Sequence, residues 1–258
     1  MAIDKPFVIV KYTLIEAVSR RFVLLFAAAI LLSIVISLYA ASLSMLEKQQ
    51  TLAAFYGFSM RLFSAGLFAA WVITAEARSL DQANAPLFLA LPVSRVQYLL
   101  ARLCGYALIA VIAQLAITLP LLVLPISSGT VLAWALSSVC ELLIVIMLAM
   151  TLVLIFSQSV VCLFLFTVIY LFARSSGEFW RHSNTILNGG GGLEQKIIAW
   201  PLKLITYLVP RLEEYAGAYW LLRDTVPPMS LRNVTLETAV YVLLLLAIAV
   251  ERIRKRAF

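Results

Sequence analysis

Two ionisable side chains inside long apolar runs are the residues of this 258-residue chain best placed to do chemistry. Arg61 interrupts an apolar run over about 52–75, and Glu141 lies in another over about 130–156. A lone charge in a bilayer costs at least about 2.5–3.5 kcal/mol, so such groups usually pair or face a cavity. Counted along helices, both lie about 14–17 Å from the same face. We predict that they pair or line a common polar path, either for transport or as a tie between helices.

Catalytic motifs are absent from the sequence. His182 is the single histidine, and no GxSxG, HExxH or metal-ligand spacing surrounds it. Gly189–Gly192 is followed by Leu-Glu-Gln, which does not fit a phosphate-binding P-loop. Cys104, Cys140 and Cys162 fall in apolar stretches without a CxxC and are expected to be buried small side chains. We expect no enzyme activity, no metal and no cofactor in this chain, so any ATP used would bind a partner subunit.

The composition indicates a membrane protein. Apolar residues make up 63% and charged residues 13%, against about 45–50% and about 25% in soluble domains. This balance excludes a soluble enzyme, a disordered chain and a secreted disulfide scaffold. Because a bilayer core of about 30 Å needs about 20 apolar residues, we predict an all-α polytopic fold with six transmembrane helices. Their approximate positions are 22–43, 52–75, 98–124, 130–156, 160–173 and 236–250, with Ser157-Gln158-Ser159 as the polar break between the fourth and fifth.

Basic residues indicate the orientation. The net charge is +7, and eleven of the twenty Lys and Arg residues lie in 1–21, 76–102 and 251–258. This clustering beside apolar spans argues for contact with membrane lipid rather than nucleic acid, and it is typical of the cytoplasmic side. Six spans then leave both termini in the cytoplasm. We expect one transmembrane domain over 1–258, in which 22–173 holds spans one to five and 174–235 is extracytoplasmic.

Two further segments flank the spans. Phe7, Val10, Leu14 and Val18 recur at helical spacing, which predicts that 1–21 forms an amphipathic helix lying in the inner interface. The alternative is that these residues simply begin the first span. Before the last span, Ile197–Leu212 is apolar but broken by prolines and a lysine, which favours a re-entrant or interfacial segment. Tyr170 falls near the predicted end of the fifth span, where aromatic rings settle at an interface.

The loop between spans two and three is the most informative segment. It opens with the charged residues Glu76, Arg78 and Asp81, continues with an apolar patch that includes Leu87 and Phe88, and leads through Pro92, Ser94 and Arg95 into the next helix. An apolar helix with charged flanks on the cytoplasmic side predicts a docking surface for a partner. The alternative is a loop lying on lipid headgroups.

Glu76 followed by LFLALPVSRVQYLLARL resembles the cytoplasmic motif of ABC-2-type transporter permeases. In that family, an acidic residue after the second span precedes a Leu-rich stretch ending in Pro-x-Ser-Arg, here Leu87–Arg95. The wider layout is also similar, with Tyr207–Glu213 resembling a proline-centred stretch before the last span. One departure is Ala83-Asn84, where the family commonly has Gly-Thr.

The resemblance implies one half of a membrane dimer, completed by a second copy or a homologous permease. Cytoplasmic ATP-binding cassette subunits would bind ATP and dock on a coupling helix between spans two and three. Substrate would be exported across the bacterial inner (plasma) membrane. The residues implied in coupling to the ATPase are Glu76, Arg78, Asp81, Leu87, Phe88, Pro92, Ser94 and Arg95.

The sequence is also compatible with other functions. An ABC complex that does mechanical work on an extracytoplasmic partner would account for the 62 residues of 174–235. A haem-exporter-like subunit is disfavoured because His182 is the only histidine. An intramembrane enzyme or an assembly scaffold would be insensitive to substitutions of Glu76 or Arg95, whereas a permease would lose ATPase coupling.

Overall fold

The chain forms a bundle of long helices. The computed structural model describes residues 4–19, 22–44, 48–79, 94–188, 194, 199–201, 203, 209–215, 217–223 and 230–255. Within these residues no strand occurs, and six helices are long and apolar enough to cross a bilayer. The helices are α1 (Asp4–Ser19), α2 (Phe22–Leu43), α3 (Lys48–Ser79), α5 (Arg95–Leu122), α6 (Ser128–Phe156), α7 (Ser159–Asn188), α9 (Ala218–Arg223) and α10 (Ser230–Lys255).

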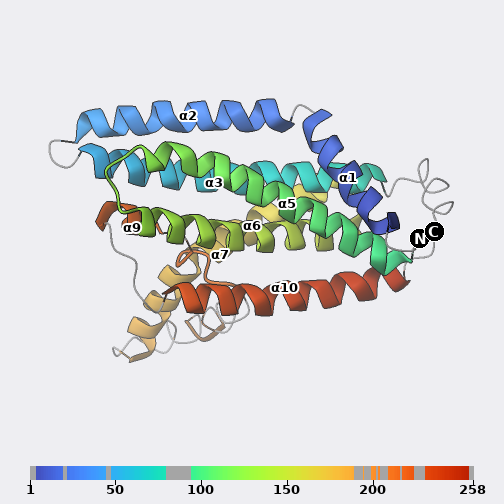
Figure 1. Ribbon diagram of the computed structural model, residues 1–258. Coiled ribbons are helices and arrows are strands. Elements are labelled where there is room, and N and C mark those ends of the chain that lie inside the picture. Colours follow the sequence, from blue (N-terminus) through green and yellow to red (C-terminus); the bar gives the residue numbers. More distant parts are fainter. Residues whose placement is uncertain are drawn as a thin grey trace.

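Figure 1 shows the six long helices side by side and alternating in direction. α1 crosses obliquely at one end of the bundle, where α3 ends, α5 begins and α10 ends; we call this the α1 end. The short α9 lies at the opposite end, which we call the α9 end, and packs against α3. This arrangement places the basic last turn of α10 at the same end as α1.

The burial pattern confirms an all-α, multi-pass integral membrane protein. α6 is the most buried helix and α10 the least, which makes α6 the central helix and places α2 and α10 at the periphery. Large apolar side chains cover the outer faces of both peripheral helices, including Leu24 at 70% and Leu243 at 65% exposure. An apolar exterior over whole helices suits lipid rather than water, and helices are stable there because they satisfy their own backbone hydrogen bonds.

The helix boundaries differ from the apolar runs at several ends. α7 does not end with the apolar run at Ala173 but continues to Asn188, and α10 begins six residues before Leu236. Thus 174–188, assigned to the extracytoplasmic region from composition, extends a transmembrane helix. The apolar run reports where side chains prefer lipid, whereas a helix continues wherever its backbone hydrogen bonds and packing are kept.

The polar break between the fourth and fifth spans is confirmed. α6 ends at Phe156, and Ser157 adopts a left-handed conformation with φ 60° and ψ −24°. Its backbone N–H donates to the Val153 carbonyl at 3.1 Å, which closes the helix. α7 starts two residues later at Ser159.

α1 is a helix of its own, so the alternative that it begins the first span is wrong. Its orientation also differs from the predicted stripe. Phe7 and Val18 are 69% and 73% exposed, whereas Thr13 and Glu16 are buried against the bundle. The inner face of α1 therefore combines the polar Thr13 and Glu16 with the apolar Ile9 and Ala17, and the outer face is mainly apolar, unlike that of an amphipathic helix on a soluble core. This arrangement is possible because the bundle supplies a buried cation, Arg102, as described below.

The described part of the segment before α10 enters the α9 end of the bundle. Leu212 and Tyr215 are 2% and 0% exposed, and the Tyr215 hydroxyl donates to the Val234 carbonyl at 3.3 Å. The backbone N–H of Arg211 donates to Glu237 Oε1 at 3.0 Å. Residues 209–215 thus pack inside the helical bundle, as a re-entrant segment would, while most of 195–208 lies outside the described residues.

The left-handed residue at the end of α6 gives a stability test. We expect Ser157→Gly to be more stable than Ser157→Ala by about 1 kcal/mol, because a Cβ is unfavourable at positive φ. Both variants lack the hydroxyl, so their difference isolates the backbone effect. Unfolding midpoints in mild detergent measure it, and an alanine variant as stable as the glycine variant would contradict the local geometry.

Candidate functional site

The described residues of the predicted coupling segment have distinct placements. Ser94 is the N-cap of α5: its Oγ accepts from the backbone N–H of Gln97 at 3.3 Å, and Gln97 Oε1 accepts from the Ser94 N–H at 3.2 Å. This capping box gives the serine of Pro-x-Ser-Arg a structural role in starting α5. Arg78 and Arg95 are exposed at the α1 end. Asp81, Leu87, Phe88 and Pro92 lie outside the described residues.

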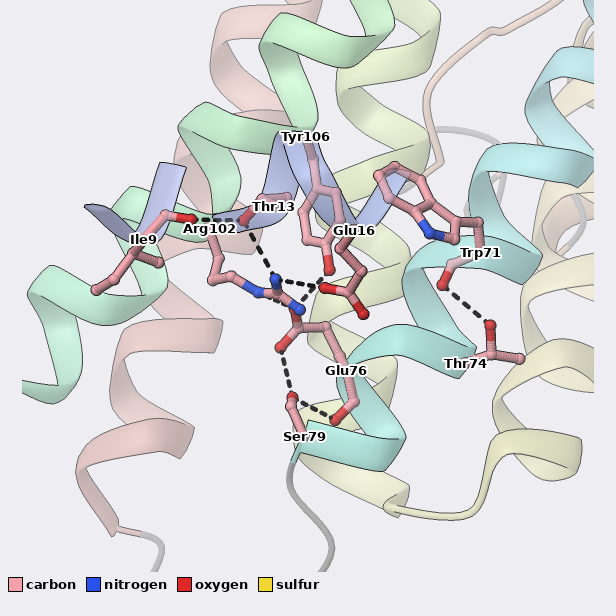
Figure 2. Close-up of polar contacts among 9 residues, drawn as sticks. All are labelled: Ile9, Thr13, Glu16, Trp71, Thr74, Glu76, Ser79, Arg102 and Tyr106. Carbon is pink, nitrogen blue, oxygen red and sulfur yellow. Dashed lines mark hydrogen bonds and ion pairs between the residues drawn. The ribbon is translucent and has the colours of Figure 1, made fainter. Parts of the chain in front are cut away.

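Glu76 belongs to a buried ionic cluster, which we call the Arg102 cluster and which comprises Thr13, Glu16, Glu76, Arg102 and Tyr106 (Figure 2). Arg102 Nε donates to Glu76 Oε1 at 2.7 Å. Its Nη1 donates to Glu16 Oε2 at 2.9 Å and to Thr13 Oγ1 at 3.1 Å. The Tyr106 hydroxyl donates to Glu76 Oε1 at 2.6 Å. One guanidinium from α5 therefore joins a carboxylate of α1 to a carboxylate of α3.

The cluster is almost fully removed from solvent. Glu16, Glu76 and Arg102 are 6%, 3% and 2% exposed. Removing one member of a buried ion pair costs about 3–5 kcal/mol, because the partner charge is left uncompensated. Glu76 is therefore not on a docking surface, and any effect it has on a partner at the loop must pass through Arg102 and the helices that the cluster joins.

A glycine allows α1 to approach α5 closely. A Cβ on Gly105 would lie 2.8 Å from the Cβ of Thr13, closer than side-chain carbons approach each other. The absence of a side chain at this position brings Thr13 within reach of Arg102, one helical turn before Gly105. The Tyr106 ring also packs against α3. It meets the Trp71 ring edge-on with 5.0 Å between ring centres, and Trp71 stacks on Phe22 with 4.6 Å between ring centres. These aromatic contacts hold Tyr106 in place beside Glu76.

A second buried cluster lies nearer the α9 end and contains the predicted pair. We call it the Glu141 cluster, and it comprises Arg61, Glu141, Tyr170 and Arg174. Arg61 Nε donates to Glu141 Oε2, and its Nη2 donates to the carbonyl of Leu212. The Tyr170 hydroxyl donates to Glu141 Oε1 at 2.8 Å, and Arg174 Nη1 lies 3.7 Å from the same oxygen. The structure thus brings Arg61 and Glu141 into contact, and the cluster joins α3, α6, α7 and residues 209–215.

Six of the nine residues in the two clusters were not predicted as site residues from the sequence: Thr13, Glu16, Arg102, Tyr106, Tyr170 and Arg174. Arg102 lies within the predicted third span, four residues before Tyr106 on the same helix face, and this intramembrane cation was the available signal. Glu16 lies in the segment 1–21, which the sequence predicts as an interfacial amphipathic helix, and it is 6% exposed inside the bundle. Tyr170 was expected at an interface but is 5% exposed and hydrogen-bonded inside the bundle. Arg174 was assigned outside the lipid because the apolar run ends before it.

The remaining candidates for chemistry form no site in the described part of the chain. His182 is exposed on the outer part of α7. Among the described residues, no three or more His, Cys, Asp or Glu side chains gather where they could hold a metal ion. Cys140 and Cys162 are buried as predicted, whereas Cys104 is exposed on the surface of α5, which corrects the prediction for that residue. A small side chain at Cys104 faces outward from the bundle, where lipid would cover it.

Comparison with known proteins adds no family assignment: the sequence matches no protein-family model and no curated protein significantly. The resemblance to ABC-2-type permeases therefore remains a prediction based on Glu76 and Leu87–Arg95.

The Glu141 cluster predicts unequal costs for two substitutions. Glu141→Gln should lower the free energy of unfolding by about 3–5 kcal/mol, because it leaves both arginines without their shared carboxylate. Tyr170→Phe removes one hydrogen bond and should cost about 0.6–1.7 kcal/mol. Thr167→Val on the exposed face of α7 serves as the control and should be nearly neutral. Denaturation in mixed detergent micelles measures all three, and equal losses for Glu141→Gln and Tyr170→Phe would contradict the shared ion pair.

Proposed function

We propose that this chain is the membrane permease subunit of an ATP-driven ABC exporter. In this proposal, a separate cytoplasmic ATPase hydrolyses ATP and drives substrate across or out of the membrane. The proposal is supported by the Glu76 and Leu87–Arg95 pattern, by the six candidate spans, and by the lack of a nucleotide-binding motif in the sequence.

The observation that carries the proposal is the position of the Arg102 cluster relative to the coupling segment. Glu76 lies in the last turn of α3, just before residues 80–93 in the sequence. α5 begins just after these residues, and Arg102 lies two turns into it. The salt bridge between these side chains joins α3 and α5, the two helices that flank the segment. The salt bridge from Arg102 to Glu16 joins α1 to the same pair of helices. A partner that pushes on 80–93 would therefore displace α3, α5 and α1 together rather than bend a loose loop.

Charge at the α1 end supports a cytoplasmic assignment for that end. The exposed basic residues there are Lys11, Arg78, Arg95, Arg252, Arg254 and Lys255. Such a concentration beside apolar spans is typical of the cytoplasmic face and of contact with anionic headgroups. With this orientation, both termini are cytoplasmic, the ATPase docks at the α1 end, and the α9 end faces the extracytoplasmic side.

Charge reversal at the docking surface tests the proposal. A tagged chain is co-expressed with the genes that neighbour its own, purified in mild detergent, and assayed by mass spectrometry and ATP hydrolysis. We expect a stoichiometric ATP-binding subunit with the wild-type chain and its loss with Arg95→Glu. Arg181→Glu, an exposed arginine on the outer part of α7, is the matched control and should retain the subunit. Absence of an ATP-binding subunit from the wild-type preparation in several detergents would contradict the proposal.

A substitution in the Arg102 cluster distinguishes binding of the ATPase subunit from an effect on its rate of ATP hydrolysis. Tyr106→Phe removes the hydrogen bond to Glu76 and leaves the ion pairs of Arg102 in place. Because Tyr106 is buried, the variant should bind the ATPase subunit as the wild type does, but should change the ATPase rate of the complex relative to the isolated subunit. A complex with wild-type ATPase rates would contradict a coupling role for the Arg102 cluster.

A further inference from the structure

The Glu141 cluster holds more positive than negative charge. Arg61 and Arg174 both approach Glu141, and no other acidic side chain of the described residues forms an ion pair with either arginine. Arg61 is hydrogen-bonded through two of its nitrogens, since Nε donates to Glu141 and Nη2 donates to the Leu212 carbonyl. Arg174 differs, because its Nη1 is buried and makes no hydrogen bond within the described part of the chain. One guanidinium charge is thus left without its own counter-ion inside a membrane domain, where an uncompensated charge is costly.

Arg174 is accessible from the side of the bundle. Its side chain is 17% exposed, and its Cζ lies 5.2 Å from the centre of the Phe58 ring on α3. Phe58 is itself 48% exposed, and Phe55 and Leu62 on α3 and Leu171 on α7 are also exposed. The guanidinium of Arg174 on α7 thus contacts α3 through Phe58, and both helices expose apolar side chains within one turn of these two residues. A ligand that approaches the exposed part of Arg174 from the lipid would meet this apolar surface as well as the guanidinium.

The depth of the site places it within the membrane. Glu141 lies fifteen residues before the end of α6, and Arg174 lies fifteen residues after the start of α7. At 1.5 Å per residue, both are about 22 Å from the α1 end of these helices and about 20 Å from the other end, which is near the middle of helices that are longer than a hydrocarbon core of about 30 Å. A water-soluble anion would have to cross apolar surface to reach this depth, whereas a membrane amphiphile is already in the lipid that surrounds the helices.

We propose that Arg174 binds the oxyanion headgroup of a membrane-resident amphiphile. The planar guanidinium matches a phosphate or carboxylate group with two parallel hydrogen bonds. The exposed apolar side chains of α3 and α7 beside Arg174 would contact the hydrocarbon chain of the same molecule. This site is distinct from the predicted docking surface, and the inference does not require the ATPase partner, since binding is a property of the chain alone.

The test uses the purified chain in a neutral maltoside detergent, without ATP or partner. The probes are dodecyl phosphate, dodecylphosphocholine with the same tail and a zwitterionic headgroup, and inorganic phosphate. Thermal unfolding midpoints are measured as a function of probe concentration, because a ligand that binds the folded state raises the midpoint. We expect dodecyl phosphate to raise it and the other two probes to have little effect.

Variants assign the binding to Arg174. Arg174→Gln should weaken the binding of dodecyl phosphate by at least about tenfold, the effect of losing charged hydrogen bonds. Arg174→Lys keeps the charge without the planar fork and should be intermediate, which also guards against a glutamine variant that fails to fold. Arg181→Gln, seven residues later on α7 and 64% exposed, is the matched control and should bind as the wild type does.

Three results would overturn the inference. Wild-type affinity for dodecyl phosphate in Arg174→Gln or Arg174→Lys would show that the arginine does not hold the headgroup. An equal midpoint shift with inorganic phosphate would show a simple anion site without a hydrocarbon-binding part. An equal shift with dodecylphosphocholine would show a general detergent effect. None of these results bears on whether an ATPase docks at the α1 end.

Discussion

The sharing of one guanidinium by two carboxylates is the constraint on which the α1 end of the structure depends. Arg102 bonds Glu16 and Glu76, and all three are buried. Because a charge left alone in such surroundings costs several kcal/mol, neither carboxylate can leave without a large penalty. This explains why α1, whose outer face is apolar and would otherwise lie anywhere in the interface, has a defined position on α5. The capping box at Ser94 fixes where α5 begins, and the glycine at 105 allows α1 to approach α5 closely.

α3 connects this cluster to the second one. Glu76 and Arg61 are fifteen residues apart on that helix, about 22 Å along its axis. The Arg102 cluster ties α3 to α1 and α5, and the Glu141 cluster ties it to α6, α7 and the inserted residues 209–215. The side chains of α3 between the two clusters are largely apolar and buried, which keeps the helix packed along its length. In the proposed transporter, α3 would therefore carry a displacement of the cytoplasmic loop to the proposed binding site within the membrane.

Much of this architecture could be predicted from residue types alone. Long apolar runs indicated all six membrane-crossing helices, and the matching depths of Arg61 and Glu141 indicated that the two would meet. The helix ends could not be predicted in this way, because composition reports lipid preference whereas α7 continues past it to Asn188. Arg102 could have been identified as a cation inside the predicted third span, but its pairing with Glu16, and that of Tyr170 and Arg174 with Glu141, depend on which helices pack together. The face of α1 was misassigned for a physical reason: in lipid, polar side chains are satisfied inside the bundle, so Thr13 and Glu16 turn inward while Phe7 and Val18 turn outward.

α1 and α3 are joined through Arg102, although Glu16 and Glu76 have no bond to each other. A double-mutant cycle with Glu16→Gln, Glu76→Gln and the double variant, measured as free energies of unfolding in mixed micelles, tests this linkage. We expect the two effects to be non-additive by at least about 1 kcal/mol, because residues that share one charged partner are energetically coupled. Additive effects within about 0.3 kcal/mol would show that the two carboxylates act independently, and would contradict a linkage of the helices through Arg102 at the α1 end.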